Sequence, residues 1–199
     1  MSAADTIMDL YDRRARDWDA DRGRDLFEKP WLEKFAKLLP PGGRVLDIGC
    51  GSGDPIARYF THSGYDVTGI DSATNMIALC REKFPAGKWI VADMRNFCLD
   101  KVFDGILMWH SLIHIRPKDQ AAIFPLIRNH LRRGSALLFT SGTEHGEQTG
   151  EWRGEPLYHG SLSAGEYRRL LKDNGFDLVE HMPDDPQCGG ATVWLARAV

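Results

Sequence analysis

Short apolar runs alternate with longer amphipathic segments along most of the 199-residue chain. The short runs predict strands, and the longer segments between them predict helices. The predicted strands are 44–48, 66–70, 88–92, 105–109, 135–140, 176–181 and 192–196. The predicted helices are 55–62, 73–84, 118–132 and 164–174.

This alternation predicts an α/β fold, because successive parallel strands need a crossover helix between them. We expect a Rossmann-like, doubly wound sheet of seven mostly parallel strands with helices on both faces. The last two strands lack a helix between them, since residues 182–191 contain two prolines and two glycines. The last strand is therefore expected to run antiparallel. Length favours a single domain over residues 1–199.

Two segments fall outside this rhythm. Residues 1–40 predict a helical cap, with Tyr11 and Trp18 on one amphipathic helix, a second helix over 30–39 and a Pro-Pro-Gly-Gly break after it. Residues 141–161 read as a long loop rich in Gly, Glu and His, with aromatic residues interspersed. A loop of this length is usually functional or disordered, and the aromatic content favours a lid over a substrate.

Composition narrows the function. The 25 basic and 28 acidic residues give a net charge of −3, which argues against a dedicated nucleic-acid binder. No apolar run approaches the ~20 residues that cross a bilayer, and the start lacks an export signal, so no membrane partner and a cytoplasmic location are expected. The four cysteines lack the close pairs that zinc sites and redox motifs use, and are interpreted as reduced thiols.

A glycine-rich loop follows the first predicted strand, in the sequence Val45-Leu-Asp-Ile-Gly-Cys-Gly-Ser-Gly53. Glycine at every second position lets the backbone turn sharply and lie flat against a ligand. A dinucleotide fingerprint requires glycine at position 54, where Asp54 stands before Pro55. A phosphate P-loop is excluded because no Gly-Lys-Ser/Thr follows.

The loop resembles the first motif of the class I S-adenosylmethionine-dependent methyltransferases, an acidic residue followed by three alternating glycines. Asp47, Gly49, Gly51 and Gly53 match that motif position by position. The resemblance implies S-adenosylmethionine as cofactor. This ligand presents a sulfonium and an ammonium, so an acidic residue at the loop favours its binding.

Further elements of the resemblance follow in order, and together they cover about residues 44–140. The resemblance implies that Asp71, ending the second strand, accepts hydrogen bonds from ribose hydroxyls. It implies that Met76 packs on the adenine face and that Asp93 accepts a hydrogen bond from the adenine amino group. The residues predicted to bind the cofactor are Tyr11, Trp18, Arg22, Asp47, Gly49, Cys50, Gly51, Gly53, Asp71, Ser72, Met76, Asp93, Met94 and Trp109.

The N-terminal helix has two interpretations. Tyr11, Trp18 and Arg22 either pack this helix on the body, or fold over the methionine end of the cofactor, where Arg22 pairs with its carboxylate, as in many relatives. In the long loop, Trp152, Tyr158 and His159 are predicted to line the acceptor pocket, on aromatic content and position alone.

Two histidines follow the fourth strand, at the rim where open α/β sheets bind ligands. His110 and His114 are the predicted catalytic residues, as a general base near neutral pH. No third ligand at suitable spacing is evident, so no metal is expected. Methyl transfer also has a route without a base, because the sulfonium is already a good leaving group.

The sequence therefore predicts a methyltransferase that moves a methyl group to O, N or S of a small molecule, as a monomer or homodimer. One alternative is an enzyme acting on nucleic acid or protein, although Trp109-His110-Ser111 stands where amino-methylating nucleic-acid enzymes carry a polar-Pro-Pro-aromatic motif. A second is a non-catalytic cofactor-binding module. A nicotinamide dehydrogenase is a distant third.

Overall fold

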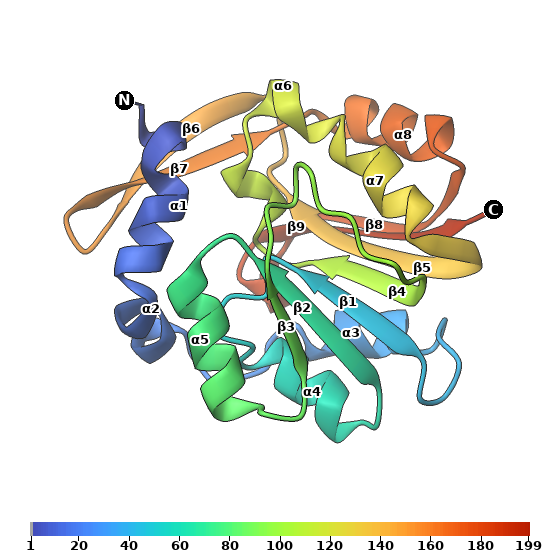
Figure 1. Cartoon of the computed structure of the whole chain (residues 1–199). Helices are drawn as coiled ribbons and strands as arrows, with labels where there is room; N and C mark the ends of the chain where they lie inside the picture. Colours follow the sequence, from blue (N-terminus) through green and yellow to red (C-terminus); the bar gives the residue numbers. More distant parts are fainter. Residues whose placement is uncertain (1) are drawn as a thin grey trace.

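The computed structural model describes residues 2–199, and its centre is a seven-stranded sheet (Figure 1). Its strands are β1 (Arg44–Ile48), β2 (Asp66–Asp71), β3 (Lys88–Val91), β4 (Phe103–Met108), β5 (Leu131–Ser141), β8 (Phe176–Asp185) and β9 (Ala191–Ala198). They are ordered β3-β2-β1-β4-β5-β9-β8. The first five are parallel to one another, and β9 is antiparallel to both β5 and β8. The predicted fold class and the antiparallel last strand are confirmed.

Helices cover both faces of the sheet (Figure 1). They are α3 (Lys29–Ala36), α4 (Ile56–His62), α5 (Thr74–Lys83), α6 (Pro117–Gln120), α7 (Ile123–Asn129) and α8 (Ala164–Asp173), with short 3-10 turns η1 (Leu112–His114) and η2 (Pro186–Cys188). Alternate residues of a strand point to opposite faces. Accordingly, Ile106 of β4 joins the core with Phe124 of α7, while Leu107 joins Phe35 of α3 and Phe60 of α4.

Two predicted elements differ from the structure between β4 and α8. The helix predicted over 118–132 is two helices, α6 and α7, and its last residues belong to β5. The loop predicted over 141–161 holds a hairpin of β6 (Gly146–Trp152) and β7 (Glu155–Ser161). Its two-residue turn, Arg153-Gly154, has positive φ at both residues, which suits the twist of a hairpin. The side chains of β6 are largely exposed, so the strand lacks the apolar alternation that identifies strands in sequence.

The N-terminal cap consists of α1 (Ala3–Arg13) and α2 (Ala15–Asp21), so helix begins well before Tyr11, where the sequence predicted it. A capping box between Ser2 and Asp5 starts α1. The cap lies beside the hairpin (Figure 1). Arg13 and Arg14 each donate to Glu155 at 2.8 Å. Segments about 140 residues apart in sequence therefore form one joint layer.

A pair of glycine substitutions tests how tightly α3 packs on the sheet. A Cβ at Gly105 would lie 2.4 Å from Phe35 Cζ, so Gly105→Ala should lower the free energy of unfolding by about 1–3 kcal/mol through overpacking. Gly165 in α8 meets only the Arg169 Nη1 atom, at 3.9 Å, so Gly165→Ala should stabilise by about 0.5–1 kcal/mol. Urea unfolding followed by circular dichroism measures both, and shifts of the same sign would contradict this packing.

Candidate active site

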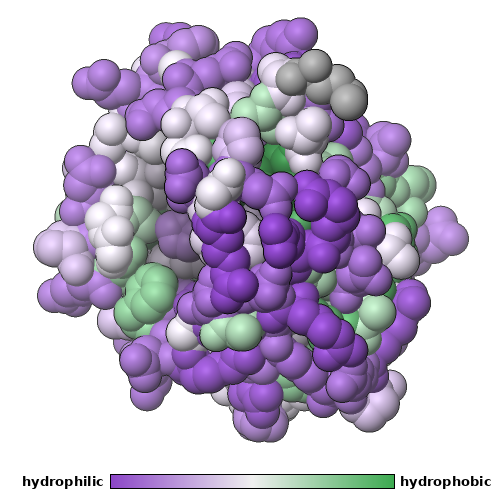
Figure 2. Space-filling model, turned by 90° about the vertical axis from the view of Figure 1, so that its left-hand side faces the viewer, coloured by the Kyte–Doolittle hydropathy of each residue, from purple (hydrophilic) through white to green (hydrophobic). Residues whose placement is uncertain are grey.

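A cavity of about 1030 Å³ opens where the carboxyl ends of β1, β2 and β4 meet the cap and the hairpin. Open α/β sheets bind ligands at this edge. Its volume is at the upper end of the range for small-molecule sites, which leaves room for a cofactor and an acceptor together. Figure 2 views the molecule from the side of the cap and hairpin, and this outer face is mostly hydrophilic.

The glycine loop follows β1 and borders this cavity. Gly49, Gly51 and Gly53 all have positive φ, between 53° and 79°, which L side chains rarely adopt. A Cβ at Gly49 would lie 2.3 Å from Ser111 Cβ, whereas a Cβ at Gly51 would meet nothing within 4 Å. Gly49 therefore lets the loop pack on the residues after β4, and Gly51 leaves an open surface beside the cavity.

Asp71, the last residue of β2, holds the glycine loop in place. Its Oδ2 accepts from the Gly51 N–H at 2.9 Å, and its Oδ1 accepts from the Ala73 N–H at 2.8 Å. Burial raises the pKa of Asp71, and these backbone N–H groups oppose that rise. The same carboxylate thus ties the loop after β1 to the start of α5 and still borders the cavity with its remaining lone pairs.

Asp47 is a second acidic side chain on the cavity, at the end of β1. It is only 4% exposed. Burial, together with the nearby charge of Asp71, raises the pKa of Asp47 to about 8. The negative charge of Asp71 makes this end of the cavity favourable for a cation, and a bound cation would also favour ionisation of Asp47.

His114 belongs to a hydrogen-bonded chain that joins three elements. Its Nδ1 lies 2.9 Å from the backbone oxygen of Tyr158 in β7, and its Nε2 lies 2.9 Å from the Tyr11 hydroxyl in α1. A carbonyl oxygen only accepts, so Nδ1 carries the proton and Nε2 accepts from Tyr11. Burial lowers the pKa of His114 to about 4, so the ring is neutral at pH 7.

His110 sits differently. Its backbone has a φ of 51° and its N–H donates to Thr140 Oγ1 at 2.8 Å, so the residue is held in the left-handed region. Its imidazole borders the cavity and has no hydrogen-bond partner among residues 2–199. Burial, followed by the positive charge of Arg22 and the neighbouring His159, lowers the pKa of His110 to about 4. Of the two predicted catalytic histidines, His110 has the free ring nitrogens, but its pKa lies below the near-neutral value that the sequence led us to expect for a general base.

Most of the predicted site residues come together on this cavity. Those that line it are Tyr11, Trp18, Arg22, Asp47, Gly49, Cys50, Gly51, Gly53, Asp71, Ser72, Met76, Met94, Trp109, His110, His114, Trp152 and His159. Asp93 and Tyr158 are not among the lining residues. The carboxylate of Asp93 accepts from the side chain of Arg95 at 2.5 Å, and Tyr158 packs against α1.

Other lining residues were missed by the sequence. Ile7 and Met8 come from the part of α1 that precedes the predicted helix, and Glu144 and Glu147 come from the segment interpreted as a loop. Ser111 also lines the cavity and donates from Oγ to the Ile48 oxygen at 2.6 Å. In the sequence, only the position of Ser111 directly after His110 indicated that it could belong to the site. The others carried no local signal, because only the tertiary fold brings them to the cavity.

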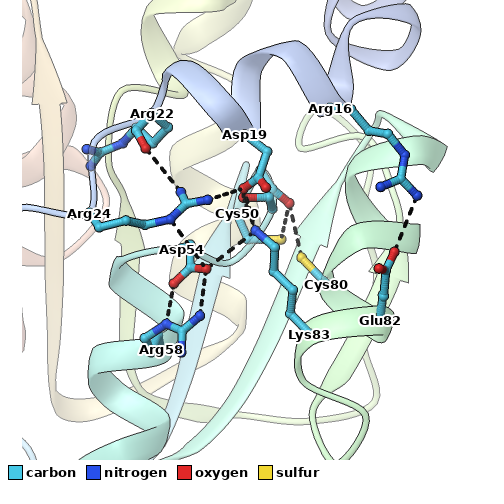
Figure 3. A network of polar contacts seen from close by, with 12 residues as sticks. Arg16, Asp19, Arg22, Arg24, Cys50, Asp54, Arg58, Cys80, Glu82 and Lys83 are labelled. Atoms are coloured by element: carbon cyan, nitrogen blue, oxygen red, sulfur yellow. Dashed lines mark hydrogen bonds and ion pairs between the residues drawn. The ribbon is translucent and has the colours of Figure 1, made fainter.

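A polar network joins the cap to the glycine loop (Figure 3). Asp19 of α2 accepts from Ser52 Oγ at 2.5 Å and pairs with Lys83 of α5. Asp54 lies 3.4 Å from Lys83 Nζ and also pairs with Arg58. These contacts attach α2 of the cap to Ser52, which lies between Gly51 and Gly53 in the glycine loop.

The same loop brings two thiols together that are 30 residues apart in sequence (Figure 3). Cys50 Sγ lies 3.8 Å from the Gly51 oxygen and Cys80 Sγ lies 3.1 Å from it. The sequence spacing gave no hint of this proximity. Both cysteines are free thiols in the structure.

Arg22 is partly neutralised where it borders the cavity. It pairs with Glu28, whose side chain is fully buried and whose Oε2 has no partner in the described part of the chain.

Residues 2–199 contain no group of three or more His, Cys, Asp or Glu side chains arranged to hold a metal ion. Within the same residues, every helix is too short or too polar to cross a bilayer.

Comparisons with known proteins identify the family. Residues 16–181 match the family model of a methyltransferase domain, so the chain belongs to that family. It is 29% identical over 166 residues to an O-methyltransferase of Pyrenophora dematioidea, across 77% of this chain and 61% of that protein. It is 28% identical over 181 residues to phosphoethanolamine N-methyltransferase 1 of Zea mays, across 85% of this chain and 34% of that protein. The chain thus spans between about a third and three fifths of these relatives.

Solved structures agree on the fold. Magnesium protoporphyrin IX methyltransferase (ChlM) from Synechocystis PCC 6803, solved with bound S-adenosylmethionine, superposes with a TM-score of 0.74 at 16% identity, over 100% of this chain and 98% of that one. The glycopeptide N-methyltransferase MtfA with S-adenosylhomocysteine gives 0.68 at 18% identity, over 85% and 89%. The predicted resemblance to the class I S-adenosylmethionine-dependent methyltransferases is confirmed.

The buried Asp47 should make stability depend on pH. A raised pKa means that the folded protein favours the neutral acid, so stability falls as pH rises from about 4, the unfolded value, to about 8. Asparagine cannot ionise, so Asp47→Asn should remove this fall in the free energy of unfolding with rising pH. The variant should gain stability over the native protein as pH rises, by at most about 1.4 kcal/mol per pH unit.

Urea unfolding at pH 5, 6.5 and 8 measures this effect. Asp177→Asn, at an exposed position of β8, is the matched control and should show no growing difference. A constant gap between Asp47→Asn and the native protein across these pH values would show that Asp47 is ionised throughout.

Proposed function

We propose that this protein is an S-adenosylmethionine-dependent methyltransferase that transfers a methyl group to O, N or S of a small-molecule acceptor. One observation carries the proposal: one large cavity has the glycine loop with the acidic side chains of Asp47 and Asp71 at one end and, beside it, the His110 imidazole, which has no hydrogen-bond partner among residues 2–199. The family match supports the same activity.

The residues present fit this cofactor. Asp47 is buried, Asp71 is partly buried, and the charge of Asp71 raises the pKa of Asp47, so a sulfonium with its ammonium group would stabilise the ionised form of both. Asp71 would hold the ribose hydroxyls, and the open backbone at Gly51 would lie against the ligand. Arg22 has donors beyond the one that Glu28 uses, and these would hold the carboxylate.

The adenine would lie beside β2 and β3. Met76, Met94 and Ala92 border the cavity there and would pack on its ring. Ser72 and Cys50 complete this end, and Trp109 and Trp18 complete the wall beside it. For Asp93 to accept from the adenine amino group, it would have to exchange its ion pair with Arg95.

When bound, the cofactor would supply a methyl group on a sulfonium. Its sulfur would leave as a neutral thioether, so the leaving group needs no proton. The chain then has to position the acceptor, exclude water and receive a proton. His110 would receive it, because its ring nitrogens are unpartnered within residues 2–199. His114 would instead hold the Tyr11 hydroxyl, because its only free lone pair already accepts from that group.

The cap formed by α1 and α2 and the segment 141–161 would together enclose the acceptor within one domain, whereas α3, also part of the predicted cap over residues 1–40, packs on the sheet. Trp18 of the cap and Trp152 of the hairpin meet edge to face, with ring centroids 5.4 Å apart, and both line the cavity. His159 lines it from β7, while Tyr158 would act from behind, through its backbone oxygen. On composition alone, the proposal adds a cytoplasmic monomer or homodimer that takes no nucleic-acid substrate.

Release of S-adenosylhomocysteine across a broad acceptor screen tests this function. The native protein should turn over at least one small acceptor, and His110→Gln should lower kcat about 100-fold with cofactor affinity unchanged. Tyr11→Phe and His114→Gln remove the same hydrogen bond, so each should have a smaller effect, and the double variant should be no worse than either.

Cofactor binding without turnover of any acceptor would favour a non-catalytic module. Loss of turnover in His114→Gln alone, with His110→Gln fully active, would reverse the two assigned roles.

A further inference from the structure

Acidic side chains outnumber basic ones in the lining of the cavity. Its carboxyl groups are Asp21, Asp47, Asp54, Asp71, Glu144 and Glu147. Asp21 pairs with Arg153 and Asp54 pairs with Arg58, so those two charges are already balanced. Arg22 is the only Lys or Arg side chain among the lining residues, and it already pairs with the fully buried Glu28. If Arg22 also holds the cofactor's carboxylate, no cation remains for the acceptor.

The acceptor end is neutral and largely apolar. His110, His114 and His159 have no carboxylate partner, and burial lowers the pKa of each, so the rings are uncharged at pH 7. Around them the cavity is lined by Ile7, Met8, Ile113, Ile115, Trp152 and Leu157. The exposed Glu144 and Glu147 add negative charge nearer the solvent.

This arrangement discriminates between acceptors by charge. A phosphate or carboxylate would lose its hydration among neutral side chains without gaining a cationic partner, and would meet two glutamates. A protonated amine has no lone pair for attack and would approach a sulfonium of like charge. An uncharged hydroxyl suffers neither penalty, and a free imidazole can accept its hydrogen bond.

We propose that the acceptor is an uncharged, largely apolar molecule that presents a hydroxyl group to His110, and that phosphorylated and carboxylated acceptors are rejected. This inference rests on the proposed methyltransferase function. The hydroxyl oxygen forms the bond to the methyl carbon, and the carbon–sulfur bond breaks with its electron pair going to sulfur. The hydroxyl proton passes to the His110 imidazole and from there to water.

Matched phenols test this proposal. Each apolar phenol is paired with an analogue that carries a carboxylate or a phosphate at the far end from the hydroxyl, and with the corresponding benzylic amine, which is protonated at pH 7. Binding to the complex with S-adenosylhomocysteine is measured by tryptophan fluorescence, and turnover by S-adenosylhomocysteine release. The neutral phenols should bind, with a Kd at least about 100-fold lower and a kcat/KM at least about 100-fold higher than those of their anionic partners.

A charge substitution provides a second measurement. Glu147→Lys places a cation at the cavity. It should lower the ratio of kcat/KM for neutral phenols to that for their anionic partners about 10-fold. Glu151→Lys makes the same charge change on the same strand, away from the cavity lining, and should leave the preference unchanged.

Anionic partners that bind or react as well as neutral phenols would overturn the proposal. So would a complex that binds no neutral phenol, or one that methylates only the benzylic amines. Failure of the protein to bind S-adenosylmethionine or S-adenosylhomocysteine at all would instead overturn the proposed function, and calorimetry without an acceptor detects that case separately.

Discussion

The carboxylate of Asp71 is the interaction on which this site depends. It accepts from the N–H groups of Gly51 and Ala73, and so fixes the loop after β1 to the start of α5. In that position the loop exposes its backbone to the cavity, and Asp71 lies close enough to Asp47 to raise the pKa of its carboxyl group. The charge of Asp71 therefore favours the neutral form of Asp47, and a cationic ligand beside both would favour ionisation of Asp47 and gain binding energy from it.

The enclosure of the cavity depends on contacts between distant segments. Glu155 in the hairpin receives both Arg13 and Arg14, and Arg153 pairs with Asp21 at 2.8 Å. These ion pairs are exposed and each contributes little by itself. They occur together with the contact between Trp18 and Trp152 and with the bond between Tyr11 and His114, so cap, hairpin and body close over the cavity as one assembly.

The sheet and the glycine loop could be predicted from sequence because their signals are local. Apolar runs identified the strands, and a loop that needs positive φ at alternate residues requires glycine there. The hairpin was missed because β6 is exposed on almost every residue. The first part of α1 was missed although Ile7, Leu10 and Tyr11 follow helical spacing and Ser2 and Asp5 form a capping box, so local signals for it were present. The pairing of Tyr11 with His114 spans 103 residues, so no local pattern reveals it. The cofactor end was thus more predictable than the acceptor end, which the cap and hairpin build by tertiary contacts.

Calorimetric titration with S-adenosylmethionine, comparing the native protein with Asp71→Asn, tests the central claim most directly. The amide presents an N–H where the carboxylate accepts from a backbone N–H, and the substitution removes the negative charge of Asp71. The native protein should bind one equivalent, and Asp71→Asn should bind about 10- to 100-fold more weakly while remaining folded. Equal affinity in the two proteins, or tight binding of an adenine dinucleotide with no heat from S-adenosylmethionine, would contradict this account.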